Sequence, residues 1–248
     1  MDNLTEFTFK PIGIIHSCFT QKFGIPRQPG LVTAATAELA LFPPFNRREC
    51  FTGLEVFSHL WVSFIFHETL SEGWRPTIRP PRLGGKKRVG VFASRSTHRP
   101  NPIGLSVVKL ESISQENDKL SLQLSEIDLL DGTPVIDIKP YLPYSDYITD
   151  ASDGFAPPPL INKPVTFSQQ AQSFCDQYQQ ATRRNLSLLT SQVLSQDPRP
   201  AYLQNSYERE YGIQLWDVNI RWHATPDDFY VNYMEPVNNE SDPSFTAR

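Results

Sequence analysis

The sequence predicts a mainly β protein, a sheet or barrel followed by a small α+β module. Up to residue 150, short segments rich in β-branched and aromatic residues alternate with turn signals. Helical periodicity begins only after residue 165, beyond a proline-rich stretch at residues 152–164. We therefore predict an N-terminal domain at residues 1–150, a linker at 151–165, a C-terminal module at 166–237 and a disordered tail at 238–248.

The first strands are predicted from local composition. Residues 7–16 alternate loosely and favour a strand, whereas residues 33–41 fit either a strand or a helical turn. Residues 54–67 form the most apolar run and are expected to be extended. Such a strand would place Leu60, Val62, Phe64 and Phe66 on one face.

Turn residues divide the second half of this domain. Residues 72–88 are rich in proline, glycine and arginine and are expected to form a long mobile loop. A strand is predicted over residues 105–113, and a half-exposed strand over 120–125, where leucine alternates with serine and glutamine. Within residues 127–138, an Asp-Gly turn separates two apolar runs.

The C-terminal module is expected to contain one helix and a hairpin. Ser168 is a plausible N-cap for a helix that ends before Asp197-Pro198. One apolar stripe runs along it, formed by Phe174, Tyr178, Ala181, Leu189 and Val193. Strict alternation over residues 216–223, followed by Phe229, Val231 and Tyr233, predicts two strands.

The bulk composition is that of an ordinary globular protein. Of 248 residues, 39% are hydrophobic and 20% are charged, and no run approaches the roughly 18 apolar residues of a membrane span. The N-terminus lacks the pattern of a signal peptide. Three scattered cysteines, Cys18, Cys50 and Cys175, favour a reducing compartment. We therefore expect a cytoplasmic protein with no membrane partner.

Positive charge is concentrated in one segment. Between Gly73 and Leu110 there are nine basic residues and no acidic one, although the whole chain has a net charge of −4. Such a segment suits a polyanion, and nucleic-acid phosphate is the obvious candidate. The alternative is a basic face that is simply solvated. That alternative explains less well why so long a segment contains no acidic residue.

Two polar loops are candidate ligand sites. Residues 90–104, GVFASRSTHRPNPIG, present Arg95, His98, Arg99 and Asn101 between two apolar runs, and two prolines stiffen the segment. A well-capped surface turn would have the same composition, and on residue types alone both interpretations stay open. Residues 22–31, KFGIPRQPGL, could hold a small ligand with free backbone amides.

Several chemistries are excluded by missing motifs. The sequence has no GxGxxG after a strand, no P-loop, no GxSxG elbow and no HExxH. A metal hydrolase using His16, His59, His67 and His98 lacks ligand spacing, so no metal site is predicted. The carboxylates that could act as bases in the β block are Asp128, Asp131 and Asp137.

Several motifs in the same order carry a resemblance. The sequence GVFASRSTHRPNPIG resembles the signature of the TsaA-like family, the TrmO or YaeB-like tRNA adenine-N6-methyltransferases. The likeness continues through KFGIPRQPGL, GLEVFSHLWVSFIFH, WRPTIRPPRLGG, DLLDGTPVIDIKPYLPY and QDPRPAY, and so covers nearly the whole chain.

The resemblance implies a single β-barrel that works as a homodimer and uses S-adenosylmethionine. The implied substrate is tRNA that carries N6-threonylcarbamoyladenosine on the 3′ side of the anticodon, methylated at N6 in threonine tRNAs. The implied cofactor contacts are Gln28, Pro29, Gly30, His67, Glu68, Arg95, Leu105, Asp131, Gly132, Thr133 and Pro134. Family members commonly have Gln at the position of Glu68, so there the backbone is the expected contact.

Roles in catalysis and RNA binding follow as hypotheses. Arg95 and Asn101 are expected to position the modified adenine, with Asp131 or His67 as proton acceptor. The residues expected to hold tRNA phosphates are Arg75, Arg79, Arg82, Lys86, Lys87 and Arg88. The alternative function is a non-catalytic RNA-binding or S-adenosylmethionine-sensing protein on the same scaffold.

Overall fold

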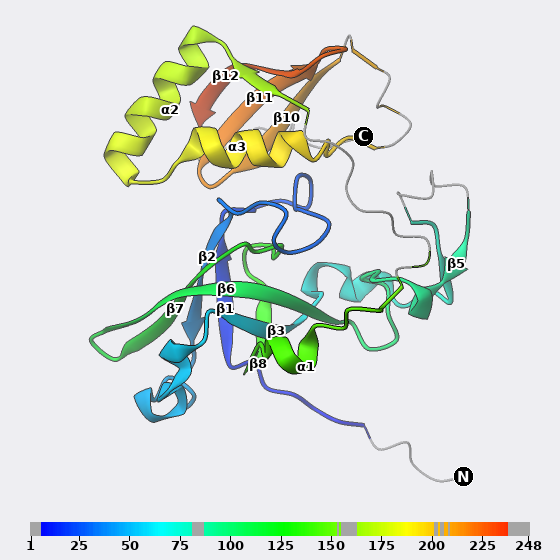
Figure 1. Ribbon diagram of the computed structural model, residues 1–248, viewed down its shortest axis with the longest axis vertical. Helices are drawn as coiled ribbons and strands as arrows, with labels where there is room; N and C mark the ends of the chain where they lie inside the picture. Colours follow the sequence, from blue (N-terminus) through cyan, green and yellow to red (C-terminus); the bar gives the residue numbers. More distant parts are fainter. Residues whose placement is uncertain are drawn as a thin grey trace.

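The N-terminal part of the chain folds into a closed antiparallel barrel (Figure 1). The computed structural model describes residues 6–80, 87–152, 154, 163–200, 203, 206–207 and 209–237. The barrel strands are β1 (Gly13–Ser17), β2 (Thr36–Leu41), β3 (His59–Ile65), β6 (Ile103–Glu116), β7 (Lys119–Ser125) and β8 (Pro134–Pro140). Their order is β1-β2-β7-β6-β3-β8, so the first and last strands pair and close the barrel.

The barrel interior is filled by the alternating apolar residues of its strands. On β3, Leu60, Val62 and Phe64 are buried, which confirms the predicted face. The strand is shorter than the predicted 54–67 because 3₁₀ helices flank it at Leu54–Val56 and His67–Glu72. Phe66 therefore lies beyond the strand.

Other strand predictions need smaller corrections. The first strand is Gly13–Ser17 rather than residues 7–16, and residues 36–41 resolve as a strand. The strand predicted over residues 105–113 extends to Glu116. The strand at Lys119–Ser125 is more buried than expected, because Ser121 and Ser125 are also covered.

The segment expected to be one long loop contains regular structure. Its residues Thr77–Ile78 form β4, which pairs with β5 (Val89–Gly90). A short 3₁₀ helix at Val91–Ala93 follows before the polar loop begins. The prediction of an unstructured segment at 72–88 was therefore wrong at Thr77–Ile78, while residues 81–86 lie outside the described residues. This small ribbon extends to the side of the barrel (Figure 1).

The C-terminal module is a four-stranded sheet with two helices on one face (Figure 1). Its strands are β9 (Val165–Phe167), β10 (Glu210–Leu215), β11 (Val218–Ala224) and β12 (Phe229–Pro236), and its helices are α2 (Gln169–Thr182) and α3 (Leu186–Ser195). The strand order is β10-β11-β12-β9, and β9 runs parallel to β12. Strands β9 and β10 have no counterpart in the sequence prediction.

The predicted single helix is in fact two. Ser168 is the N-cap, as predicted, and its side chain accepts a hydrogen bond from the Ala171 backbone N–H. Arg183 then adopts a left-handed conformation with φ 65° and ends α2. Asn185 caps α3 through the Leu188 N–H, so the apolar stripe is divided between two helices.

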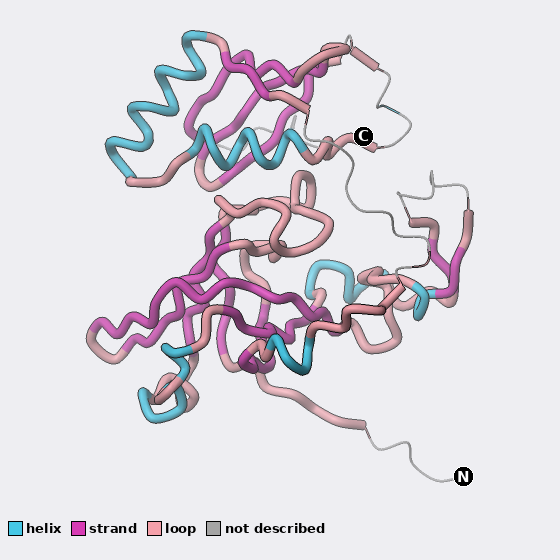
Figure 2. The backbone as a smooth tube through the Cα atoms, viewed as in Figure 1, coloured by secondary structure: helices cyan, strands magenta, loops and turns pink. Residues whose placement is uncertain are grey.

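All loops that carry predicted site residues leave the barrel at the same end. Residues 18–35, 66–102 and 126–133 connect the strands there, and we call this the loop end. The tube drawing shows loops on the side of the barrel that faces the C-terminal module (Figure 2). The opposite end is formed by the 42–58 connection, the β6–β7 hairpin and α1 (Pro143–Asp146). No helix among the described residues is long and apolar enough to cross a bilayer.

Candidate functional site

Three segments distant in sequence meet at the loop end. The Gly30 N–H donates to the Glu126 carbonyl at 2.9 Å. This hydrogen bond joins the loop at residues 18–35, which we call the first loop, to the segment before β8. The Arg95 guanidinium donates to Gln28 Oε1, which joins the first loop to the stretch 90–104. The structure therefore brings together Gln28, Gly30 and Arg95, three of the residues that the family resemblance implies as cofactor contacts.

The turn at Asp131–Pro134 is fixed by backbone hydrogen bonds to β1. Asp131 Oδ1 accepts from the Ser17 N–H at 2.8 Å, and the Gly132 N–H donates to the Ile15 carbonyl at 2.8 Å. Gly132 has φ +77°, a conformation that favours glycine. Thr133 is buried, and its hydroxyl donates to the Leu130 carbonyl. One carboxylate oxygen of Asp131 is thus committed to holding its own turn.

His67 and Glu68 begin the 3₁₀ helix that follows β3. A Cβ built on Gly132 would lie 3.8 Å from His67 Nε2, so the imidazole borders the Asp131–Pro134 turn. Three-quarters of the His67 side chain is covered, whereas Glu68 is half-exposed. The Glu68 carbonyl accepts from Lys22 Nζ at 3.3 Å, so its backbone contacts the first loop.

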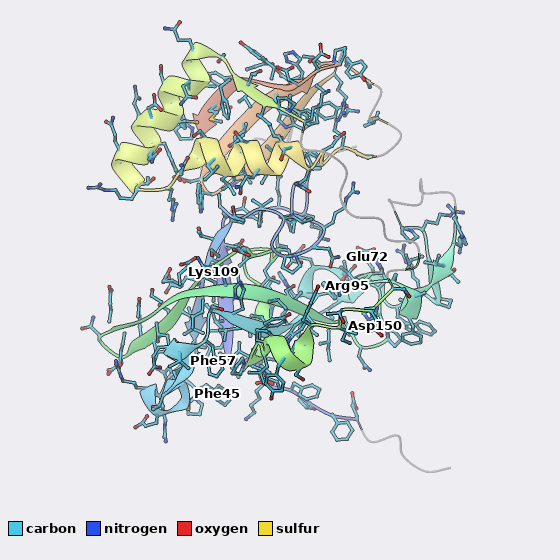
Figure 3. All side chains as sticks on the ribbon, in the orientation of Figure 1. Phe45, Phe57, Glu72, Arg95, Lys109 and Asp150 are labelled. Atoms are coloured by element: carbon cyan, nitrogen blue, oxygen red, sulfur yellow. The ribbon has the colours of Figure 1, made fainter. Side chains whose placement is uncertain are left out.

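The stretch 94–102 is held in shape by its own side chains. Arg99 donates to the carbonyls of Val91 and Ser94 at 3.2 and 2.7 Å. His98 Nε2 lies 2.9 Å from Glu72 Oε2, and this hydrogen bond lowers the pKa of the Glu72 carboxyl. Arg99 and His98 therefore stiffen the loop, while Arg95 and Asn101 are exposed on it. Arg95 and Glu72 are both labelled in Figure 3.

Leu105 differs from the other implied cofactor contacts. Gly104 and Ser106 on either side of it are buried in the barrel, so its own side chain faces outward and is 54% exposed. Its partner in the strand register is Ser63 of β3. The other implied contacts lie on loops, on the 3₁₀ helix that begins at His67 and, for Pro134, at the first residue of β8.

The basic residues lie on the β4–β5 ribbon and the segment leading to it. Arg75, Arg79, Lys87 and Arg88 are all exposed, although Arg75 pairs with Glu72 and Arg88 donates to the Thr77 hydroxyl. Arg82 and Lys86 lie outside the described residues. Lys109, the last basic residue of the acid-free window, pairs with Glu111 at 2.9 Å and lies away from Arg95 (Figure 3).

A half-buried carboxyl group, that of Asp128, accompanies these residues. Asp128 Oδ1 accepts a hydrogen bond from the buried Ser106 hydroxyl at 2.6 Å. Burial raises the pKa of Asp128 to about 6, and the nearby positive charge of Arg95 opposes that rise. The sequence hypothesis gave Asp131 or His67 as the acceptor. Asp128 was one of the three possible bases in the sequence, and it stands within the apolar run IDLL.

The site has no metal-binding geometry in the part of the chain that the structure describes. No group of three or more His, Cys, Asp or Glu side chains there could hold a metal ion. His16 lies near Asp131, His67 near Gly132 and His98 against Glu72. These histidines are therefore bound into separate local contacts.

Comparison with known proteins identifies the family. The model of the tRNA-methyltransferase O N-terminal domain matches residues 14–147, and that of the TrmO C-terminal domain matches residues 161–237. A tRNA (adenine(37)-N6)-methyltransferase of Escherichia coli is 46% identical over 237 residues, which cover 94% of this chain and all of that protein. A putative S-adenosylmethionine-dependent methyltransferase of Pseudomonas aeruginosa is 50% identical over 88% of this chain and 93% of its own length.

Solved structures agree with this assignment. A crystal structure of TrmO from P. aeruginosa superposes with a TM-score of 0.78 at 44% identity, covering 94% of this chain and 99% of that one. A Pyrococcus abyssi protein described as a probable S-adenosyl-L-methionine-binding protein is 38% identical over 56% of this chain and 70% of its own length. With both domain models matched in order, this chain belongs to the tRNA-methyltransferase O family.

Proposed function

We propose that this protein transfers a methyl group from S-adenosylmethionine to N6 of N6-threonylcarbamoyladenosine, beside the anticodon on its 3′ side, in threonine tRNAs. The observation that carries the proposal is the meeting of the Gln28–Gly30 loop, Arg95 and the Asp128–Pro134 segment at one end of the barrel. The named relatives support the reaction and the cofactor.

The residues at the loop end suit an adenosylated sulfonium cofactor. Gly30 and Gly132 both have positive φ, and a Cβ on them would be in van der Waals contact, at 3.8 Å, with Glu126 Oε2 and His67 Nε2, so without a Cβ each backbone leaves room for close approach. Backbone groups can approach adenine and ribose there, and Asp131 offers a carboxylate to hydroxyl or ammonium groups. We assign cofactor binding to Gln28, Pro29, Gly30, His67, Glu68, Arg95, Leu105, Asp131, Gly132, Thr133 and Pro134.

When bound, S-adenosylmethionine supplies an electrophilic methyl group on sulfur. The protein has to hold the N6 lone pair in line with that carbon, so positioning supplies much of the rate. Arg95 and Asn101 are exposed on a stiffened loop and can orient the modified adenine. Nitrogen loses its proton as the new C–N bond forms and the C–S bond breaks, so an acceptor is needed.

The proton acceptor is one of three groups near Arg95 and the Asp131 turn. Asp131 uses one oxygen to hold Ser17, and His67 borders Gly132. Asp128 has a pKa near 6 and is ionised at neutral pH without being far from protonation. We favour Asp128, and keep Asp131 and His67 as the alternatives.

The basic ribbon is assigned to the tRNA backbone. Arg75, Arg79, Lys87 and Arg88 are exposed on the element that precedes the Arg95 loop, and Arg82 and Lys86 belong to the same acid-free window. Contacts to phosphates would hold the anticodon stem-loop without reading its sequence. Base-specific selection would then fall to the Arg95–Asn101 loop.

We further propose a homodimer that acts in the cytoplasm. Large apolar side chains near α1 support an interface: Tyr144, Tyr147 and Ile148 are 88, 68 and 64% exposed. The three free cysteines support a reducing compartment. Sedimentation at several protein concentrations tests the dimer, and a monomer throughout would contradict it.

One experiment tests the proposed reaction. Purified protein is given methyl-labelled S-adenosylmethionine and threonine tRNA that either carries or lacks the threonylcarbamoyl group. We expect label only in the modified tRNA, and nuclease digestion followed by mass spectrometry should place it on N6 of that nucleoside. Equal labelling of both tRNAs would refute the substrate. Binding of tRNA and cofactor without transfer would instead support the non-catalytic alternative.

A further inference from the structure

We propose that the C-terminal module positions the cofactor loop of the barrel, and that Gln192 is its main positioning residue. The loop in question is residues 18–34, which carries Gln28, Pro29 and Gly30. It lies between the barrel and the C-terminal module (Figure 1). The inference rests on the proposed cofactor site.

Gln192 holds the end of this loop with both atoms of its side-chain amide. From α3, its Nε2 donates to the Thr33 hydroxyl at 2.8 Å, and its Oε1 accepts from the Ala34 N–H at 2.8 Å. The half-buried side chain of Gln192 thus forms hydrogen bonds with two adjacent residues, Thr33 and Ala34, which are 159 and 158 residues away in sequence. A bidentate contact of this kind fixes both the position and the direction of the backbone.

The start of the loop is held by the C-terminal sheet. Phe19 forms an antiparallel bridge with Leu215 of β10, and the Trp216 N–H donates to the Cys18 carbonyl at 2.9 Å. Cys18, Phe19 and Leu215 are fully or almost fully buried and belong to one core that spans both parts of the chain. The first two residues of the loop are therefore joined to β10, the edge strand of the C-terminal sheet.

The middle of the loop approaches the same module closely. Gly24 has φ +90°, and a Cβ placed on it would overlap Ile213 Cδ1 of β10. Val193 of α3 lies on the same side, within 3.6 Å of that position. The loop is thus fixed at its start, middle and end by elements of the C-terminal module.

These contacts continue into the site. The Phe19 carbonyl accepts from the Asp131 N–H at 2.8 Å, so the residue bridged to Leu215 also holds the Asp131 turn. At the other end, the Gly30 N–H donates to the Glu126 carbonyl. Both segments assigned to the cofactor therefore depend on where the C-terminal module places residues 18–34. Displacement of a positioning loop by about 1 Å can have a large effect on function.

The test compares Gln192→Ala with Gln192→Glu and with Gln180→Ala on the exposed surface of α2. Loss of two hydrogen bonds should weaken S-adenosylmethionine binding about tenfold in Gln192→Ala. We expect the KM for the cofactor to rise by a similar factor, while kcat at saturating cofactor and the melting temperature change little. Calorimetric titration and steady-state assays of the full chain provide both readouts.

The conservative variant serves as the rescue. In Gln192→Glu, the carboxylate can accept from both the Ala34 N–H and the Thr33 hydroxyl, so affinity should return to within about threefold of the parent protein. Gln180→Ala should be indistinguishable from the parent. A merely structural role would instead lower the active fraction, and hence kcat, without moving the KM for the cofactor.

Gln28→Ala separates failure of this inference from failure of the cofactor site. If Gln28→Ala weakens cofactor binding while Gln192→Ala leaves it within twofold, the positioning role is refuted and the site stands. If neither variant changes binding, the assigned site itself is wrong. Hydrogen exchange adds a reciprocal readout, because cofactor binding should slow exchange in peptides covering residues 186–195 and 213–218. Absence of that protection in the parent protein would also overturn the proposal.

Discussion

The two ends of the barrel differ in what they offer a ligand. The opposite end contains a cavity of about 410 Å³ lined mainly by apolar residues, among them Leu41, Phe45, Phe51 and Phe57. The loop end instead gathers the Gln28–Gly30 loop, Arg95 and the half-buried carboxyl group of Asp128. Phe45 and Phe57 lie far from Arg95 (Figure 3). An apolar hollow is the usual first choice for a binding site, but here the convergent polar chemistry lies elsewhere.

Among substitutions at the two ends of the barrel, we expect the largest loss of methyl-transfer activity from Arg95 at the loop end. Arg95→Ala should reduce methyl transfer by at least a factor of about 100, because it removes a charged group that orients reacting molecules. Folding should be retained, since the guanidinium is exposed. Asp137→Asn at the cavity is the matched control and should retain activity. Near-full activity of purified Arg95→Ala would contradict our assignment of the loop end.

Asp128→Asn should show opposite effects on activity and stability. If Asp128 accepts the proton, methyl transfer should fall at least about tenfold at pH 8. Stability should change in the other direction, because the folded protein holds this carboxyl with a pKa of about 6, above its ordinary value. Its burial therefore costs nothing below about pH 4, the cost grows as the pH rises from about 4 to 6, and it is complete above pH 6.

Denaturant unfolding at two pH values measures this second effect. The Asn variant should gain about 1–3 kcal/mol over the parent protein at pH 8, and little at pH 4. In the parent, activity should rise through pH 6 as Asp128 ionises. A variant that is no more stable at pH 8 than its parent would show that the carboxyl is not buried in charged form.

The basic ribbon should contribute to tRNA affinity without affecting the cofactor. Arg79→Ala combined with Lys87→Ala should weaken tRNA binding several-fold and reduce the slope of log K against log salt by about 1.5 to 2. Arg47→Ala with Lys119→Ala, which removes two exposed charges near the opposite end, is the control. An unchanged salt slope in the ribbon variant would show that the ribbon is not part of the tRNA interface.

The smallest effect is expected from cysteine labelling. Cys50 lines the cavity and is exposed, whereas burial raises the pKa of Cys18 to about 12 and that of Cys175 to about 11. Iodoacetamide should therefore add one group to the native protein, at Cys50, with less than twofold loss of activity. Mass spectrometry should find three groups after denaturation. A large loss of activity on labelling Cys50 would indicate that the functional site lies at the cavity and not at the loop end.

The sequence predicted the elements whose pattern is local. Alternation on β3 gave the inward face correctly, and Ser168 was recognised as a cap from its position alone. The division of the helix at Arg183 could not be foreseen, because arginine rarely adopts positive φ and no glycine marks the turn. β9 has only three residues, Val165–Phe167, and its pairing with β12 is a long-range contact.

In the candidate site, too, the features that depend on long-range contacts could not be predicted from the sequence. The family resemblance implied Arg95 and Gln28 as separate contacts, but their hydrogen bond joins residues 67 positions apart. Asp128 was noticed only as one of several carboxylates, because its hydrogen bond with Ser106 of β6 joins residues 22 positions apart. The role of Gln192 depends on a contact between domains and has no signal in sequence.

The pairing of β1 with β8 has a consequence for how the chain acquires its fold. Gly13 faces Val135 across the closing strands, and hydrogen bonds from the Ile12 N–H to the Val135 carbonyl and from the Ile15 N–H to the Thr133 carbonyl tie the same two segments together. The barrel therefore cannot close until nearly all of its sequence has been synthesised, and closure must overcome the entropy of a very long loop. Folding should accordingly be slow.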